Sequence, residues 1–304
     1  VAFSEAVGRH TSKGDALLDR ILQLGPRPAQ DAIREILESF DVVRRVTPKA
    51  ATAWLSSCAG AGRPRVAVAL LGALREVRMD VNVIHYNAAI KACDQAGEWA
   101  LALDLLNTMS SNRIASTSRT CRPAISALDK GGKWAAAVSL FEEMVEAEVE
   151  VDSFCCNAAI SACRKGKQWA LALGLLSSMK RYGIEMNTIT YTSAITTCEQ
   201  NAWRAAIALL KTMGEETVDR DVITYTAAIS ACERAGEWEA ALGILGSMAE
   251  AGIRHGTSSL NAAISACGNA GEWEVALSLL GGMAEAGAER DAISYGAAIS
   301  ACEK

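Results

Sequence analysis

Residues 222–256 read VITYTAAISACERAGEWEAALGILGSMAEAGIRHG, and this stretch decides the fold. Its first part places apolar side chains at steps of three and four, at Tyr225, Ala228, Ile229 and Cys232. That spacing predicts an amphipathic helix with one buried face. Gly236 interrupts the pattern, and Gly252 stands where a left-handed C-terminal cap is expected. Between the two glycines lies the apolar stripe of a second helix, formed by Trp238, Ala241, Leu242, Leu245 and Met248.

The same pattern recurs along the chain. The segment YTAAISAC at 225–232 returns as YNAAIKAC at 86–93, CNAAISAC at 156–163 and LNAAISAC at 260–267. The step from Trp169 to Trp203 is one residue shorter than the others, which indicates a deletion in the turn around Asn201 and Ala202. Tryptophan and methionine keep the same period, at Trp99, Trp134, Trp169, Trp203, Trp238 and Trp273, and at Met109, Met144, Met179, Met213, Met248 and Met283.

This period divides most of the chain into repeats. They span 48–82, 83–117, 118–152, 153–187, 188–221, 222–256 and 257–291, and a truncated repeat follows at 292–304. Two helices of about 12 residues cannot bury both of their apolar stripes alone, but stacking on neighbouring repeats can bury them. We therefore expect an all-α fold, a right-handed α-α superhelix (solenoid) of helix-turn-helix repeats of about 35 residues.

The N-terminal part is less regular. We expect residues 1–47 to form a degenerate helical repeat or cap, in which Ala32 still occupies the small-residue position of a second helix. The repeat array then covers 48–304. Because the chain begins at Val1 without a leader sequence and stops soon after an apolar helical face, we expect it to be a piece of something longer.

Composition narrows the functional classes. The formal net charge is −5, which argues against a general polyanion binder but allows a nucleic-acid site confined to one groove. We expect no membrane partner, because no stretch approaches the roughly 20 apolar residues of a membrane-spanning helix.

The period also accounts for residues that resemble functional sites. We expect the tryptophan and methionine series to pack in the core rather than to form a binding surface. Cys155 and Cys156 are adjacent, which is not the spacing of a zinc or redox site. Seven of the ten cysteines share one repeat position, where they behave as small buried hydrophobes and favour a reducing compartment: Cys58, Cys93, Cys163, Cys198, Cys232, Cys267 and Cys302.

The chain shows no catalytic constellation. His10, His85 and His255 share no repeat position, and the sequence contains neither a phosphate-binding P-loop nor a nucleophile elbow. We therefore expect no enzyme activity, no catalytic residue, no cofactor, no metal and no small-molecule substrate.

The order of residues in each repeat resembles the pentatricopeptide-repeat family. The pattern is an early Tyr followed by Asn or Thr, Gly at the turn, then Ala, Leu and Met, with Gly-Ile near the end. The resemblance covers about residues 48–304. It implies sequence-selective binding of single-stranded RNA, one base per repeat, in the processing, stability or translation of a chloroplast or mitochondrial transcript. Any targeting segment would lie outside this sequence.

In this family the fifth residue of a repeat bonds the base edge, and the last residue tunes that contact. Carried over, the resemblance implies that the RNA reads 5′-A-Y-N-Y-G-R-U-3′, with Arg122 and Gly256 departing from the family pattern. The pairs are Thr52 with Asn82, Asn87 with Thr117, Arg122 with Asp152, Asn157 with Asn187, Thr192 with Asp221, Thr226 with Gly256, and Asn261 with Asp291.

Two further rows complete the implied site. The second residue supplies apolar plates that sandwich the bases, at Ile84, Phe154, Ile189 and Ile223, unless these side chains merely pack at the start of the helix. Lys49, Arg119 and Ser258 depart from this row, although the Arg119 guanidinium can stack. Near the end of the first helix, Lys130, Lys165 and Arg234 are candidates for phosphate contact, with acids beside them.

Two other interpretations remain at this stage. A tetratricopeptide-like solenoid would bind an extended peptide or a partner helix in its groove, and protein partners are possible. The polar residues at the fifth and last positions favour RNA over that interpretation. An enzyme domain beyond Lys304 is the other possibility, and nothing within the chain supports it.

Overall fold

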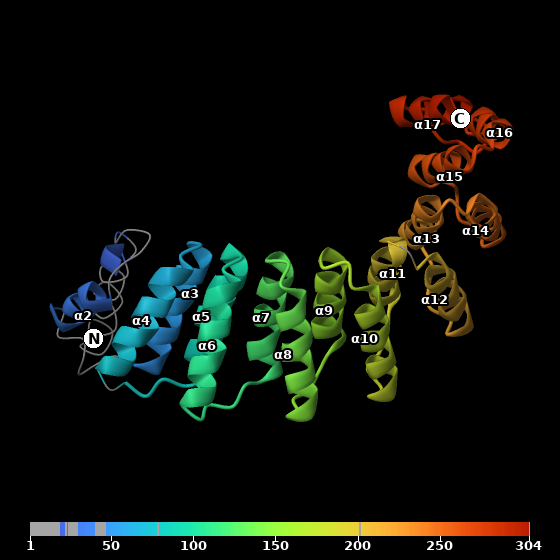
Figure 1. Cartoon of the computed structure of the whole chain (residues 1–304). Helices are drawn as coiled ribbons and strands as arrows, with labels where there is room; N and C mark the ends of the chain where they lie inside the picture. The colour runs from blue at the N-terminus through green and yellow to red at the C-terminus, as the bar shows by residue number, and fades with distance from the viewer. Residues whose placement is uncertain are drawn as a thin grey trace, which may run out of the picture. The chain divides into compact units, whose positions relative to one another are not determined.

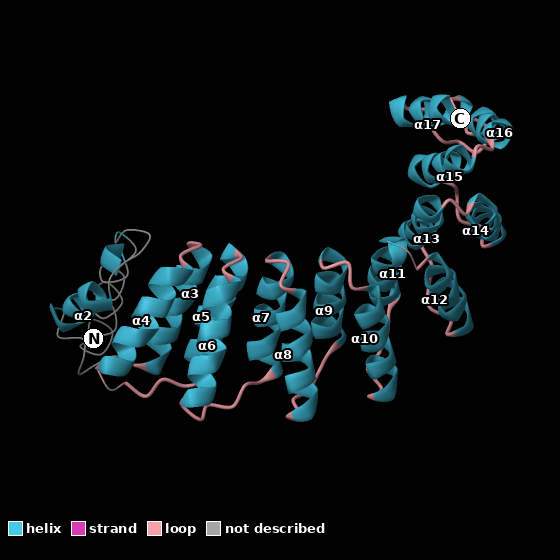
Figure 2. Cartoon of the chain, in the orientation of Figure 1, coloured by secondary structure: helices cyan, strands magenta, loops and turns pink. Residues whose placement is uncertain are grey.

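The computed structural model describes residues 19–21, 23, 30–39, 47–77, 79–200 and 202–303. Within these ranges all regular structure is helical (Figure 2). After α2 (Gln30–Ser39), the first and second helices of successive repeats alternate (Figure 1). The first helices are α3 (Pro48–Gly60), α5 (Val83–Ala96), α7 (Ser118–Lys130), α9 (Ser153–Lys165), α11 (Thr188–Thr197), α13 (Val222–Ala235), α15 (Thr257–Ala270) and α17 (Ala292–Cys302). The second helices are α4 (Pro64–Glu76), α6 (Trp99–Ser111), α8 (Trp134–Glu146), α10 (Trp169–Arg181), α12 (Trp203–Glu215), α14 (Trp238–Glu250) and α16 (Trp273–Gly282). The all-α repeat fold predicted from the period is confirmed.

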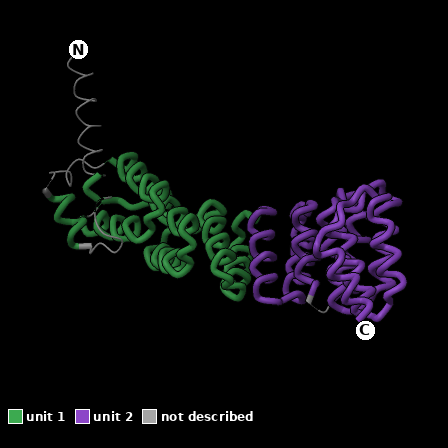
Figure 3. The backbone as a smooth tube through the Cα atoms, turned by 90° about the horizontal axis from the view of Figure 1, so that it is seen from above, with its two compact units in different colours: residues 1–151 green, residues 152–304 purple. Residues whose placement is uncertain are grey.

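The chain forms two compact units, residues 1–151 and 152–304 (Figure 3). In the first unit, α3, α5 and α7 pack side by side, and in the second unit α9, α11, α13, α15 and α17 do the same. Each second helix packs on the first helix of its own repeat. Every repeat therefore presents its first helix to the first helices of its neighbours in the same unit.

The core of the second unit shows why this sequence stacks. Tyr225, Ala228, Ile229 and Cys232 on α13 are all fully buried, as their spacing predicts. Alanines at equivalent places, such as Ala263 on α15, leave no bulk between neighbouring first helices, so the helices can approach closely. On the second helices the methionines are buried, which confirms their predicted role.

The tryptophan series differs from the prediction of core packing. Trp169 and Trp273 are 38% and 48% exposed, and the other members of the series are half-buried. Each is the first residue of its second helix, so its ring lies at the edge of the helix pair. A Cβ at Gly131 would lie 2.4 Å from Trp99 Cδ1, which shows that this ring covers the turn of the following repeat.

The shortened repeat has a local structural consequence. Where other first helices continue, α11 ends at Thr197 and passes into the 3₁₀ turn η1 (Cys198–Gln200). A 3₁₀ turn advances farther per residue than an α-helix, and it accommodates a connection with one residue fewer. Asn201 lies outside the described residues.

The turns explain the glycines of the repeat. Gly236 ends α13 with a φ of 73°, and Gly252 follows α14 with a φ of 71°, as expected for left-handed caps. Arg113, Glu148 and Thr217 adopt the same left-handed φ after other second helices. Thr217 is the least favourable of these, because its β-branched side chain is rarely found in that region.

The buried cysteines behave as the repeat position predicts. Nine of the ten are buried, but Cys302, which shares the repeat position of six of them, is exposed, so the prediction of burial is wrong there. Burial, reinforced by neighbouring carboxylates, raises the pKa of the Cys93 and Cys156 thiols to about 12. Such thiols stay protonated at neutral pH and are poor nucleophiles and poor metal ligands.

The N-terminal stretch is described only in part. α2 packs against α4, the next second helix, and buries Ile33 and Leu37, while Ala32 is half-buried. Most of the rest of the expected degenerate repeat, and His10, lie outside the described residues. None of the helices described is long and apolar enough to span a membrane. Over the same residues, no group of three or more His, Cys, Asp or Glu side chains could hold a metal ion.

Candidate nucleic-acid interface

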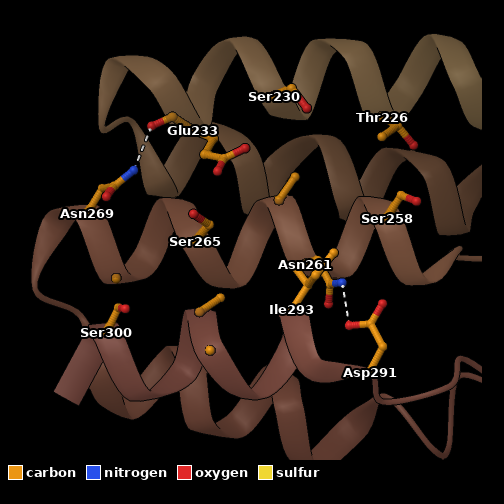
Figure 4. A pocket seen from close by; sticks show the side chains of 14 residues that line it. Thr226, Ser230, Glu233, Ser258, Asn261, Ser265, Asn269, Asp291, Ile293 and Ser300 are labelled. Carbon is orange, nitrogen blue, oxygen red and sulfur yellow. Dashed lines mark hydrogen bonds between the residues drawn. The ribbon is translucent and has the colours of Figure 1, made fainter.

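A groove of about 700 Å³ runs across the first helices α13, α15 and α17 (Figure 4). Thr226 and Asn261, the fifth residues of their repeats, line this groove. Asp291, a last residue, lines it too, as do Ser258 and Ile293 from the second position. The second unit thus brings together, on one surface, three rows that the family resemblance assigns to base contact.

The second-position side chains are exposed. Ile189 and Ile223 are 63% and 67% exposed, and Ile84 and Phe154 are 55% and 45% exposed. Side chains that merely began the helix by packing would be covered, so these exposures disfavour the packing interpretation. Ile293, at 67%, continues the row in the truncated repeat, where the sequence prediction did not place a member.

The last residue of each repeat is also the N-cap of the next first helix. The Asp221 carboxylate accepts a hydrogen bond from the Thr224 backbone N–H at 2.8 Å, and Asn187 accepts one from Thr190 at 3.1 Å. Asp152 and Asp291 cap α9 and α17 in the same way. Asn82 accepts from the Ile84 N–H at the start of α5, and Thr117 caps α7. Capping fixes the position of these side chains at the start of each first helix, and Asp291 is thereby held at the edge of the groove.

A third side chain joins the fifth and last residues at several sites. It is the third residue of the following repeat, which is fully buried at Thr120, Thr224 and Ser294. The Thr192 and Thr224 hydroxyl oxygens are 2.7 Å apart, and the Thr224 hydroxyl donates to Asp221 at 2.7 Å. The Ser294 hydroxyl oxygen is 2.6 Å from Asn261 Oδ1, and Asn261 Nδ2 donates to Asp291 at 3.1 Å. The Thr120 hydroxyl oxygen is 2.7 Å from Asn87 Oδ1.

Three fifth residues, Thr52, Thr226 and Asn157, lack this link. Thr52 and Thr226 donate to the backbone oxygens of Pro48 and Val222 within their own helices. Asn157 Oδ1 is buried without a hydrogen-bond partner. Thr190, the third residue that follows Asn157, donates to Asn187 instead.

The candidate phosphate ligands are engaged with neighbouring repeats. Lys130 Nζ lies 2.8 Å from an Asp94 carboxylate oxygen and donates to the Asp94 carbonyl as well. Arg234 pairs with Glu199 at 3.5 Å. Burial of Glu199 raises the pKa of its carboxyl group, while Arg234 opposes that rise. Lys165 is exposed at the end of α9. A phosphate would have to compete with Asp94 and Glu199, and phosphate contact at these three residues stays a prediction.

One row in the groove was missed by the sequence prediction. Ser230, Ser265 and Ser300 line the groove beside the fifth residues. The signal is present in the sequence, because each is the serine of a repeated I-S-A-C segment. The Ile, Ala and Cys of this segment, which are buried in α13 and α15, led to its prediction as core. The serine, however, lies on the opposite side of the helix from the buried stripe.

Comparisons with known proteins agree along most of the chain. A family model described as pentatricopeptide repeat-containing protein matches residues 51–179, a pentatricopeptide repeat domain model matches 208–270, and a PPR repeat model matches 258–287. A search of curated proteins gave no match.

Solved structures share the fold. The crystal structure of the pentatricopeptide repeat protein PPR10 from maize superposes with a TM-score of 0.63 at 22% identity, covering 89% of this chain and 39% of that one. PPR10 in complex with an 18-nt psaJ RNA element gives a TM-score of 0.66 at 16% identity, covering 93% and 42%. The chain therefore spans about two fifths of the length of PPR10. At these identities the likeness is one of fold.

Proposed function

The chain belongs to the pentatricopeptide-repeat family, and we propose that it binds single-stranded RNA selectively, reading one base with each repeat. The observation that carries this proposal is the shared surface of three rows in the second unit. The groove sets one exposed apolar plate, Ile293, beside the polar pair Asn261 and Asp291, and Ile223 is exposed at the second position of α13. Plates that stack on bases and polar groups that bond base edges are the two elements that single-stranded recognition requires.

The polar character of the groove disfavours a peptide-binding role. Grooves that hold an amphipathic helix offer a continuous apolar surface. Here the groove over α13, α15 and α17 is lined mainly by Ser, Thr, Asn, small residues and carboxylates, with Ile293 as its one large apolar side chain among the described lining residues. The proposed role is binding, with no chemical step assigned to the chain. Action on a chloroplast or mitochondrial transcript is part of the proposal and rests on family resemblance alone.

Affinity is expected to fall steeply with salt. If Lys130, Lys165 and Arg234 each neutralise one phosphate, raising KCl from about 50 to 200 mM should weaken binding roughly tenfold to twentyfold. Fluorescence anisotropy with the labelled heptamer A-Y-N-Y-G-R-U measures this directly, with the same bases in shuffled order and a DNA version as controls.

The alternative makes a different prediction in the same assay. A peptide-binding solenoid would show no saturable binding to either RNA at the lower salt concentration. Equal affinity for the ordered and shuffled heptamers would contradict base reading while leaving general RNA binding in place.

A further inference from the structure

At two sites in the second unit, a buried hydroxyl contacts the fifth residue of one repeat from the first helix of the next. Thr224 and Ser294 are fully buried, so neither can contact a base directly. Each lies between a fifth residue, Thr192 or Asn261, and a capping carboxylate, Asp221 or Asp291. Any influence on the RNA must therefore pass through the fifth residue.

At the first site the carboxylate fixes the direction of the hydrogen bonds. An ionised Asp221 can only accept, so the Thr224 hydroxyl gives it its single hydrogen, over 2.7 Å. The Thr224 oxygen can then only accept from Thr192, 2.7 Å away. The Thr192 hydroxyl therefore donates its only hydrogen to Thr224. What Thr192 retains for a base is an oxygen lone pair, which is a hydrogen-bond acceptor.

At the second site the fifth residue is an asparagine, and its amide is left with a donor. Because the Asp291 carboxylate only accepts, the Asn261 atom facing it must be Nδ2, which settles the orientation of the amide (Figure 4). Asn261 Oδ1 is occupied by the Ser294 hydroxyl at 2.6 Å. Asn261 retains its second N–H, which is a donor. Bonds from the Ser294 backbone N–H and from Asn261 Nδ2 hold the pKa of Asp291 below its ordinary value, so it is an ionised acceptor at neutral pH.

We propose that the hydroxyl at the third residue of the following repeat, here Thr224 or Ser294, fixes which hydrogen-bonding group the fifth residue offers a base, because it occupies the other polar group of that residue. Thr224 leaves Thr192 an acceptor, which suits the N–H groups on the edge of guanine. Ser294 leaves Asn261 a donor, which suits a carbonyl oxygen of uracil. Thr224 and Ser294 are positioning residues, and this inference rests on the proposed RNA-binding function.

The pair Asn87 and Thr117 shows what happens without a carboxylate. Thr120 contacts Asn87 at 2.7 Å and the Thr117 hydroxyl at 3.1 Å. Thr117 can both donate and accept, so nothing fixes the direction of these bonds. The second base is accordingly expected to be read less sharply than the fifth and the seventh.

The test is Thr224→Val, which keeps the shape of the side chain and removes the hydroxyl. The Thr192 hydrogen is then released toward the base, and the preference for guanine over the other bases at position five should fall about tenfold, the usual effect of one hydrogen bond. Discrimination at the seventh base should not change. Thr224→Ser keeps the hydroxyl and should retain the guanine preference.

Thr190→Val is the matched control. Thr190 caps its helix with Asn187 as Thr224 does with Asp221, but it donates to Asn187 and not to the fifth residue Asn157. The control should lower the melting temperature without changing the preference at the fourth base. Ser294→Ala provides an independent test at the seventh base: it frees Asn261 Oδ1 to accept from other bases, so uracil preference should fall about tenfold even if Thr224→Val does not fold.

The outcomes separate the two proposals. If wild-type protein binds no RNA, the proposed function fails and the inference falls with it. If wild type binds and prefers guanine at the fifth base, but folded Thr224→Val keeps that preference, only the inference is overturned. An equal loss of affinity for all heptamers would also overturn it, because that result indicates a purely structural cap.

Discussion

Thr192→Asn is expected to change the preferred fifth base from guanine to uracil. The substitution gives that site an amide, a carboxylate in Asp221 and a hydroxyl in Thr224, the same three groups that Asn261, Asp291 and Ser294 provide. The amide should orient its nitrogen toward Asp221 and offer a donor to the base. Losing one base-specific hydrogen bond and gaining another should change the guanine-to-uracil affinity ratio by about thirtyfold to a hundredfold.

Competition binding with heptamers that differ only at the fifth base measures this ratio. Thr226→Asn is the matched control. The last residue of its repeat is Gly256, which has no carboxylate, and the Thr226 hydroxyl donates to the backbone of its own helix. That variant should gain little uracil preference at the sixth base. A Thr192→Asn protein that folds and still prefers guanine would show that these three groups do not define the reading.

Loss of the apolar plates is the second large effect. In the double variant Ile189→Asp and Ile223→Asp, affinity for the heptamer should fall by about a hundredfold or more. Stacking contributes about 1–3 kcal/mol per base, and each new carboxylate also repels phosphate. Because both isoleucines are more than half exposed, the free energy of unfolding should change little. Anisotropy and a denaturant titration measure the two quantities.

The chain supplies its own control for this variant. Leu171 and Leu277, on the second helices α10 and α16, are 39% and 41% exposed. Changing both to Asp introduces the same charge outside the predicted plates and should leave RNA affinity within about twofold, apart from the long-range repulsion that salt screens. If the isoleucine variant unfolds instead, Ile189 and Ile223 have a packing role after all.

The period predicted most of the fold because burial repeats with it. Tyr225, Ile229 and Cys232 had to lie on one face, and stacking was the only way to cover that face. The exposed tryptophans escaped this reasoning, since periodicity gives the direction of a side chain and not how far the next repeat covers it. The left-handed φ of Thr217 was not predicted either. Its alignment with Gly252 of the next repeat could have indicated it.

The site was predictable in its rows but not in its connections. The sequence places Thr192 and Asp221 in one repeat, and the family pattern pairs them. Thr224 belongs to the next repeat, where a threonine at the third helical residue is expected simply to cap the helix. Its contact with Thr192 depends on how two first helices pack, which residue spacing alone does not determine.

Selection from a pool of randomised single-stranded RNA, with the 304-residue chain at two salt concentrations, tests base reading most directly. We expect enrichment of 5′-A-Y-N-Y-G-R-U-3′, strongest at the fifth and seventh bases and weakest at the third and sixth, where Arg122 and Gly256 depart from the family pattern. Raising the salt should lower the yield without changing the motif, because phosphate contacts carry no sequence information. No enrichment, or a motif unrelated to this one, would contradict the account.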